Sequence, residues 1–224
     1  AKHIQRALAA KDGAIVPLIA ETGGLNAMVV DSSALPEQVV DAVVQSAFRS
    51  AGQRCSALRL LCVHEGIADG VIAMIGGALQ ELAVGDPAAY ATDVGPVIDA
   101  EAHAAITRHL ERLDRDATLL ARRAVPDGPA GAQHIAPCAY ELARVADLRQ
   151  EVFGPVLHVV RWGPGTAARG GAADVEALVG QINALGYGLT LGVQTRIDSR
   201  AQRVAHAARV GNVYVNRNMI GAVA

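Results

Sequence analysis

Residues 58–82 read LRLLCVHEGIADGVIAMIGGALQEL, a short apolar run followed by a longer segment with helical spacing. The run 58–63 is too short for a helix and rich in Leu and Val, which predicts a buried strand. In residues 67–82 the large apolar side chains recur every three or four positions, which predicts a helix packed on that strand. A strand joined directly to a packed helix is the unit of α/β folds.

The same alternation continues on both sides of this segment. Residues 163–171 are rich in Gly and Ala and predict an exposed loop. Ser199, with Gln202 three positions later, predicts a capping box. We expect parallel strands joined by helical crossovers, an α/β three-layer sandwich with a mostly parallel sheet. Further strands are predicted at 15–20, 27–30, 118–121, 134–138, 156–162, 189–194 and 212–216, and helices from Pro36 and at 100–113, 175–185 and 199–208.

The composition excludes several classes of protein. The chain has 224 residues, of which 51% are hydrophobic, and a formal net charge of −2. That apolar fraction excludes a disordered chain. With 20 Lys and Arg against 22 Asp and Glu there is no basic excess for binding nucleic acid through bulk charge. No apolar run approaches the ~18 residues of a membrane span.

The three cysteines, Cys55, Cys62 and Cys138, form no C-x-x-C pair, and the seven histidines form no i, i+4 pair beside a carboxylate. We therefore expect neither a disulfide framework nor a metal site, which fits a reducing cytoplasm. No G-x-G-x-x-G motif follows a strand, so a nucleotide-binding fold is expected outside these residues.

Cys55 differs from the other two cysteines in its surroundings. It lies in GQRCS (52–56), a polar turn between a helix and a buried strand, where loops display nucleophiles. Arg54 beside it favours the thiolate, weakly if exposed. We interpret Cys62 and Cys138 as core residues.

Two carboxylates stand beside glycine turns. Glu21 ends the apolar run 15–20 and leads into a Thr-Gly-Gly turn. A partly buried Glu there can act as a general base near neutral pH, and a solvated charge at a strand end is the alternative. Glu151 lies in EVFGP (151–155), where a carboxylate can bind ribose hydroxyls while Phe153 packs on a flat ligand. A solvated Glu151 with Phe153 in the core is the alternative there.

In order and spacing these motifs resemble the aldehyde dehydrogenase superfamily. The matching segments extend over nearly the whole chain: ETGG (21–24), GQRC (52–55), EVFGP (151–155), GYGLT (186–190) and GNVYVN (211–216). Three longer segments are similar to the glutamate semialdehyde dehydrogenase module of bifunctional proline utilisation A proteins: AETGGLNAM (20–28), GQRCSALR (52–59) and NRNMIGAV (216–223).

The resemblance implies the Cys-bearing catalytic domain of an NAD-dependent aldehyde dehydrogenase, which oxidises L-glutamate γ-semialdehyde (1-pyrroline-5-carboxylate) to L-glutamate in proline catabolism. It makes Cys55 the nucleophile that forms a thioester, and Glu21 the base that activates the hydrolytic water. The cofactor-binding residues it implies are Glu151, Phe153, Thr22 and Gly23. The substrate-binding residues are Ser56, Gly221 and Ala222, to which we add Arg54 for its charge.

We also expect features that lie outside this sequence. The chain opens with AKHIQ (1–5) in a helical pattern and ends with the apolar MIGAVA (219–224), so we expect residues 1–224 to be an excised catalytic domain. The resemblance implies a separate nucleotide-binding domain with an oxyanion-hole Asn, and a further C-terminal segment. It also implies a homo-oligomeric full-length protein, and FAD in any separate proline dehydrogenase domain. We therefore expect little dehydrogenase activity from this chain alone.

Two other interpretations are weaker. A non-catalytic scaffold or oligomerisation domain would not need Cys55, Glu21 and Glu151 together. A cysteine hydrolase or acyltransferase would need a His base beside the cysteine, and no His has a suitable position in the sequence.

Overall fold

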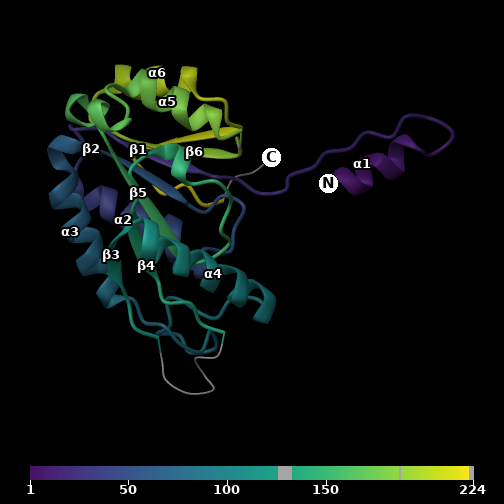
Figure 1. Ribbon diagram of the computed structural model, residues 1–224, viewed down its shortest axis with the longest axis horizontal. Coiled ribbons are helices and arrows are strands. Elements are labelled where there is room, and N and C mark those ends of the chain that lie inside the picture. Colours follow the sequence, from purple (N-terminus) through teal and green to yellow (C-terminus); the bar gives the residue numbers. More distant parts are fainter. Residues whose placement is uncertain (126–132, 187, 222–224) are drawn as a thin grey trace.

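The predicted alternation of strands and helices forms one mostly parallel sheet. A computed structural model describes residues 1–125, 133–186 and 188–221 (Figure 1). In that part of the chain seven strands pair in the order β3-β4-β5-β2-β1-β6-β7. Neighbouring strands are parallel except β3 and β4, which are antiparallel. The strands are β1 (Ala27–Val30), β2 (Leu60–His64), β3 (Thr118–Arg122), β4 (Cys138–Glu141), β5 (Val156–Trp162), β6 (Thr190–Gln194) and β7 (Asn212–Val215).

Helices cover both faces of this sheet and make a three-layer sandwich. The helices α2 (Pro36–Phe48) and α3 (Glu65–Glu81) pack on one face, and α4 (Ala100–Asp116), α5 (Val175–Ala184) and α6 (Asp198–Ala207) on the other. Successive residues of a strand point to opposite faces. Accordingly Met28 and Val30 of β1 belong to the core beneath α2 and α3, and Ala27 and Val29 to the opposite core. The predicted α/β three-layer architecture is confirmed.

The strand predicted at residues 15–20 is wrong. Ile15 is 97% exposed and Ile19 is 89% exposed, and none of the described strands pairs with this segment. The preceding helix α1 (Lys2–Ala9) buries none of its residues. Figure 1 shows α1 on an arm that leads away from the sheet. Apolar composition alone does not make a strand, because the backbone also needs a neighbouring strand to pair with.

The strand predicted at 134–138 begins later, at Cys138. Pro137 has no N–H to donate to a ladder. Pairing with the β5 side of the sheet starts at Cys138, whose N–H donates to the carbonyl of Pro155 at 3.1 Å. Residues 163–171, predicted as a loop, are largely exposed and contain the short 3-10 helix η4 (Pro164–Arg169).

The capping box predicted at Ser199 is also wrong. Helix α6 begins one residue earlier, and its N-cap Ile197 makes no side-chain cap hydrogen bond. Gln202 instead donates to the carboxylate of Asp198 at 2.7 Å. The side-chain contact within the first turn is thus an i, i+4 pair rather than a capping box.

Cys62 and Cys138 are core residues, as predicted. Both are 0% exposed, and burial raises the pKa of each thiol, for Cys138 to about 12. These two side chains are therefore unreactive thiols at neutral pH. Among the described residues, no helix combines the length and the apolar character needed to cross a membrane.

Candidate active site

Three of the predicted site segments meet at one edge of the sheet. The ETGG turn (21–24) precedes β1, the GQRCS turn (52–56) precedes β2, and EVFGP (151–155) precedes β5. Because β5, β2 and β1 are parallel neighbours, their amino ends lie at the same edge. The first and third segments are joined directly, since the N–H of Gly24 donates to Oε1 of Glu151 at 3.1 Å.

The backbone before Cys55 is strained. Ser50 and Ala51 of the 3-10 turn η1 (Arg49–Gly52) have φ of 56° and 51°, and Gly52 has φ of 66°. Left-handed backbone costs a non-glycine residue about 1–2 kcal/mol. At Gly52 a side chain would also collide with the carbonyl oxygen of Gly154. This reversal follows α2 directly and leaves Cys55 exposed at the edge of the sheet.

Asn26 holds the cysteine turn to the sheet. Its side chain is buried, and its amide donates to the carbonyl of Cys55 at 2.7 Å and to that of Ala57 at 2.9 Å. Its Oδ1 accepts from the N–H of Thr190 at 3.1 Å. One buried amide thus connects the amino ends of β1 and β6 to the turn before β2.

Gln53 fixes the other side of the same turn. Its Oε1 accepts from the N–H of Ile98 at 2.8 Å, and its Nε2 donates to the carbonyl of Pro96 at 3.3 Å. Arg54 is exposed, and its Nε donates to Oγ of Ser50 at 3.0 Å. The Arg54 side chain therefore lies back along its own turn.

Glu21 differs from its predicted surroundings. It is exposed, as in the solvated alternative, but it follows irregular backbone rather than a strand. Thr22 is exposed as well. Gly23 has φ of 119°, and a side chain there would collide with the carboxylate of Glu151. The glycine therefore lets this carboxylate lie against the ETGG turn.

The alternative of a solvated Glu151 with Phe153 in the core is wrong, because both side chains lie at the surface of the site. The Glu151 side chain is 17% exposed, and Phe153 is 42% exposed. Arg59, which is 0% exposed, lies behind them: its guanidinium carbon is 5.1 Å from the centre of the Phe153 ring, and its Nη2 is 3.9 Å from Oε1 of Glu151. Burial lowers the pKa of Arg59 to about 10 against the opposing charges of Glu151 and Cys55, so Arg59 is a cation at neutral pH.

Ser56 and Gly221 are far apart in the sequence but lie together. Ser56 is buried, and its Oγ accepts from the N–H of Gly221 at 3.4 Å. The chain reaches this place by running back beside α2, where the N–H of Met219 donates to Oγ of Ser46 at 3.0 Å. Ala222, the remaining predicted substrate residue, lies outside the described residues.

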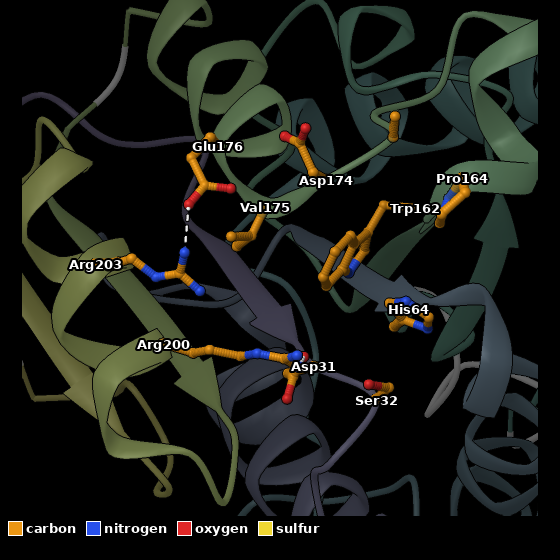
Figure 2. Close-up of a pocket in the computed structure, with 11 residues that line it drawn as sticks. Asp31, Ser32, His64, Trp162, Pro164, Asp174, Val175, Glu176, Arg200 and Arg203 are labelled. Carbon is orange, nitrogen blue, oxygen red and sulfur yellow. Dashed lines mark hydrogen bonds and ion pairs between the residues drawn. The ribbon is translucent and has the colours of Figure 1, made fainter.

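A separate cavity of about 250 Å³ lies at the opposite edge, where β1, β2 and β5 end (Figure 2). Its polar groups bind one another. Arg203 pairs with Glu176 at 3.1 Å, and Arg200 pairs with Asp31. Burial opposes ionisation of Asp31, but hydrogen bonds from Ser33 and Thr195 and the Arg200 charge lower the pKa of its carboxyl. None of the predicted site residues lines this cavity, and among the described residues no group of three or more His, Cys, Asp or Glu could hold a metal ion.

Comparison with known proteins places this arrangement in a family. The sequence model of the aldehyde dehydrogenase family matches residues 1–224. This chain belongs to the aldehyde dehydrogenase family. The bifunctional protein PutA of Escherichia coli (strain K12) is 50% identical over 229 residues, which cover 98% of this chain and 17% of that protein. The 1-pyrroline-5-carboxylate dehydrogenase of Geobacillus kaustophilus (strain HTA426) is 33% identical over 210 residues, which cover 92% of this chain and 38% of that protein.

Solved structures agree with the aldehyde dehydrogenase fold. A crystal structure of a bifunctional proline utilization A (PutA) protein superposes with a TM-score of 0.90 at 54% identity, over 99% of this chain and 21% of that chain. The fold implied by the resemblance is confirmed. The chain spans only 17% of the length of the E. coli bifunctional relative.

Three residues that hold this candidate site together were not among the predicted site residues: Asn26, Gln53 and Arg59. Asn26 and Arg59 occur in the motifs that carry the resemblance, but their side-chain partners come from distant segments. Arg59 left a signal, because a charged residue inside the apolar run 58–63 is costly to bury unless it is paired. Gln53 is part of the GQRC motif, but a polar residue in a turn is ordinary and does not indicate its hydrogen-bond partners.

Proposed function

We propose that residues 1–224 are the catalytic domain of an NAD-dependent dehydrogenase that oxidises L-glutamate γ-semialdehyde to L-glutamate. The observation that carries this proposal is the meeting of the ETGG, GQRCS and EVFGP segments at one edge of the sheet, with the Gly24–Glu151 hydrogen bond between two of them. The similarity to a bifunctional PutA and to a 1-pyrroline-5-carboxylate dehydrogenase supports the substrate class.

Cys55 is the nucleophile in this proposal. Its thiolate attacks the aldehyde carbon, a C–S bond forms, and the carbonyl oxygen takes the negative charge of a thiohemiacetal. Loss of a hydride from that carbon is a two-electron oxidation that leaves a thioester on Cys55; NAD⁺, when bound, supplies the hydride acceptor. The exposed position of Cys55 favours attack by this thiol over the buried Cys62 and Cys138.

Glu21 is the base of the second half of the reaction. Its carboxylate takes a proton from a water molecule whose oxygen attacks the thioester carbon. The C–S bond then breaks, so that the acid leaves and Cys55 returns to a thiolate. Glu21 is exposed, which gives it access to water.

Glu151 and Phe153 fit the nicotinamide ribose of a cofactor. One carboxylate oxygen of Glu151 accepts from Gly24, which fixes the group and leaves lone pairs for ribose hydroxyls. The partly exposed Phe153 ring offers a flat apolar surface beside it. Thr22 and Gly23 lie on the turn beside this carboxylate, and the missing side chain of Gly23 lets the carboxylate lie against the turn. We place both residues near the nicotinamide. The adenosine half would be held by a nucleotide-binding domain outside these residues.

The substrate's α-carboxylate is assigned to Ser56, Gly221 and Ala222. A hydroxyl and backbone N–H groups are suitable neutral donors for an anion. The 3.4 Å contact between Oγ of Ser56 and the N–H of Gly221 supports a shared position for two of these groups. Arg54 adds positive potential at the exposed side of the turn rather than a fixed contact.

We propose a wider setting for the full-length protein. It is a cytoplasmic homo-oligomer that supplies the nucleotide-binding domain, with FAD in a proline dehydrogenase domain if it is bifunctional. Residues 1–224 alone then have little or no dehydrogenase activity, because the oxyanion-hole Asn and most of the cofactor site lie outside them. Turnover by the isolated chain at the rate of an intact enzyme would contradict this division.

Alkylation tests whether Cys55 is the accessible thiol that this proposal requires. Iodoacetamide should label Cys55 at least about tenfold faster than Cys62 and Cys138 in the folded chain. The rates are measured by mass spectrometry of the three cysteine peptides, with labelling in urea as the reference for equal access. Equal rates for all three cysteines in the folded chain would remove the support for a displayed nucleophile.

A further inference from the structure

Arg59 is a fully buried cation at the centre of the predicted site. It is 0% exposed, and its Nη2 donates to the carbonyl of Arg54 at 3.1 Å. Its Nη1 donates to the carbonyl of Gly154 at 3.3 Å. The same guanidinium lies 3.9 Å from Glu151 and faces the Phe153 ring. One side chain therefore contacts the Cys55 turn and the EVFGP segment together.

These contacts need the shape of a guanidinium. An apolar residue of similar size would fill the space but would lose both guanidinium hydrogen bonds and the charge beside Glu151. The other donors to these two carbonyls, the N–H groups of Ala57 and Val156, lie next to their acceptors in the chain, so they do not join the two segments. Lysine would keep the charge, but its ammonium is a point charge and lacks the planar fork that reaches two carbonyls and packs on a ring.

The main chain of Arg59 is also fixed from the opposite side. Its carbonyl accepts from the backbone N–H of His158 at 3.0 Å and from Nδ1 of His158 at 2.9 Å. Because a carbonyl only accepts, His158 carries its proton on Nδ1, and its Nε2 must accept from Nε2 of His109 at 2.8 Å. The backbone of Arg59 is thus anchored on β5 and α4, while the side chain reaches the two loops.

We infer that Arg59 is a positioning residue that couples the Cys55 turn to the Glu151–Phe153 segment, so that the order of one segment depends on the other. If the proposed function holds, on which this part of the inference rests, the coupling sets the distance between the nucleophile Cys55 and Glu151, which holds the nicotinamide ribose. In the part of the chain that the structure describes, Cys55 and Glu151 share no hydrogen bond, and Arg59 joins their segments through the Arg54 carbonyl and the Glu151 carboxylate.

Amide hydrogen exchange of the 224-residue chain tests the coupling. In Arg59→Met we expect exchange in peptides spanning 50–56 and 151–155 to accelerate about tenfold or more, with β1 and α3 unchanged. The matched control is Arg161→Met, because Arg161 pairs with Glu141 and Asp69 away from this site. It should leave both peptides at the wild-type rate.

A second variant removes one end of the link without touching the core. Glu151→Gln should accelerate exchange at 50–56 several-fold, although the hydrogen bond and ion pair of Glu151 go to Gly24 and Arg59 rather than to that turn. The buried Cys62 and Cys138 report global unfolding, because iodoacetamide labels them only when the fold opens. If Arg59→Met exposes these thiols, the result of Glu151→Gln decides the question alone.

The proposal is overturned if folded Arg59→Met leaves the exchange of peptides 50–56 and 151–155 at the wild-type rate. It is also overturned if folded Glu151→Gln leaves the exchange of peptide 50–56 at that rate. If Arg59 only filled space, Arg59→Met would leave the exchange rates unchanged, because methionine is of similar size. The exchange readout needs no turnover, so it stands or falls separately from the dehydrogenase assignment. In a full-length protein that oxidises the semialdehyde, Arg59→Lys should raise the KM for NAD⁺ several-fold more than it lowers kcat, and equal losses in both would contradict the positioning role.

Discussion

The buried pair His109 and His158 makes the free energy of unfolding depend on pH between about pH 7 and pH 5. Both rings are buried, and their Nε2 atoms are 2.8 Å apart. Burial lowers the pKa of His109 to about 4, with a further effect of the Arg112 charge. Burial likewise lowers the pKa of His158 to about 3, with further effects of His109 and of the Arg59 and Arg112 charges.

The direction and size of the change in unfolding free energy with pH follow from proton uptake on unfolding. The unfolded chain binds a proton at each ring below the ordinary pKa of 6.5, whereas the folded chain does not until pH 4 or below. The free energy of unfolding is therefore highest above pH 6.5 and falls as the pH decreases. Between pH 7 and pH 5 the loss is about 2 kcal/mol per histidine and about 4 kcal/mol for the pair, a large part of the stability of an ordinary domain.

Urea unfolding of the chain at pH 7, 6 and 5, at constant ionic strength, measures this loss. The double variant His109→Leu/His158→Leu should show a much smaller decrease, since it removes both titrating partners together. His103→Gln is the matched control, because His103 lies on the same helix outside the pair. A wild-type free energy of unfolding that is unchanged from pH 7 to pH 5, or a double variant that falls as steeply, would refute the reasoning.

Two further predictions concern the support of the cysteine turn. Asn26→Ala should lower the free energy of unfolding by about 2–4 kcal/mol in urea titrations, because the carbonyl of Cys55, the buried carbonyl of Ala57 and the buried N–H of Thr190 each lose their partner. A loss below about 0.5 kcal/mol, within the range of surface substitutions, would contradict this. Gly52→Ala should cost about 2 kcal/mol or more, since φ is 66° and a Cβ would meet the carbonyl of Gly154. Gly77→Ala is its control, because Gly77 lies in α3 with open space around it, and a loss at Gly77 as large as at Gly52 would count against the strained turn.

The spacing of apolar residues predicted most of the fold, because the residues of both cores recur with the periods of strands and helices. The strand at Val156–Trp162 has the predicted bounds, and α2 begins at Pro36 as expected. The failure at 15–20 has a different origin. Whether an apolar run becomes a strand depends on a neighbour in space, and this information lies elsewhere in the chain. The late start of β4 has a local cause instead, because Pro137 has no N–H to donate to a ladder.

The site could be predicted as a set of motifs but not as a geometry. The order of the motifs pointed to Cys55, Glu21 and Glu151, and the sheet brings the segments that carry them to one edge. Of the two alternatives for Glu21, the structure shows the solvated carboxylate, and the strand expected before it does not form. The link through Arg59 could not be read from the sequence, since its partners come from positions 54 and 151–154. Such contacts exist only after the strands pair.

Peptide mass spectrometry of a Glu21→Gln full-length protein tests the central claim most directly. After mixing with NAD⁺ and glutamate semialdehyde, the peptide spanning 52–59 should carry a glutamyl thioester on Cys55, because hydrolysis has lost its base. The unsubstituted protein should turn over without accumulating the adduct, and Cys55→Ala should neither turn over nor form it. An adduct on another residue, or oxidation retained by Cys55→Ala, would contradict the assignment of Cys55 as the nucleophile.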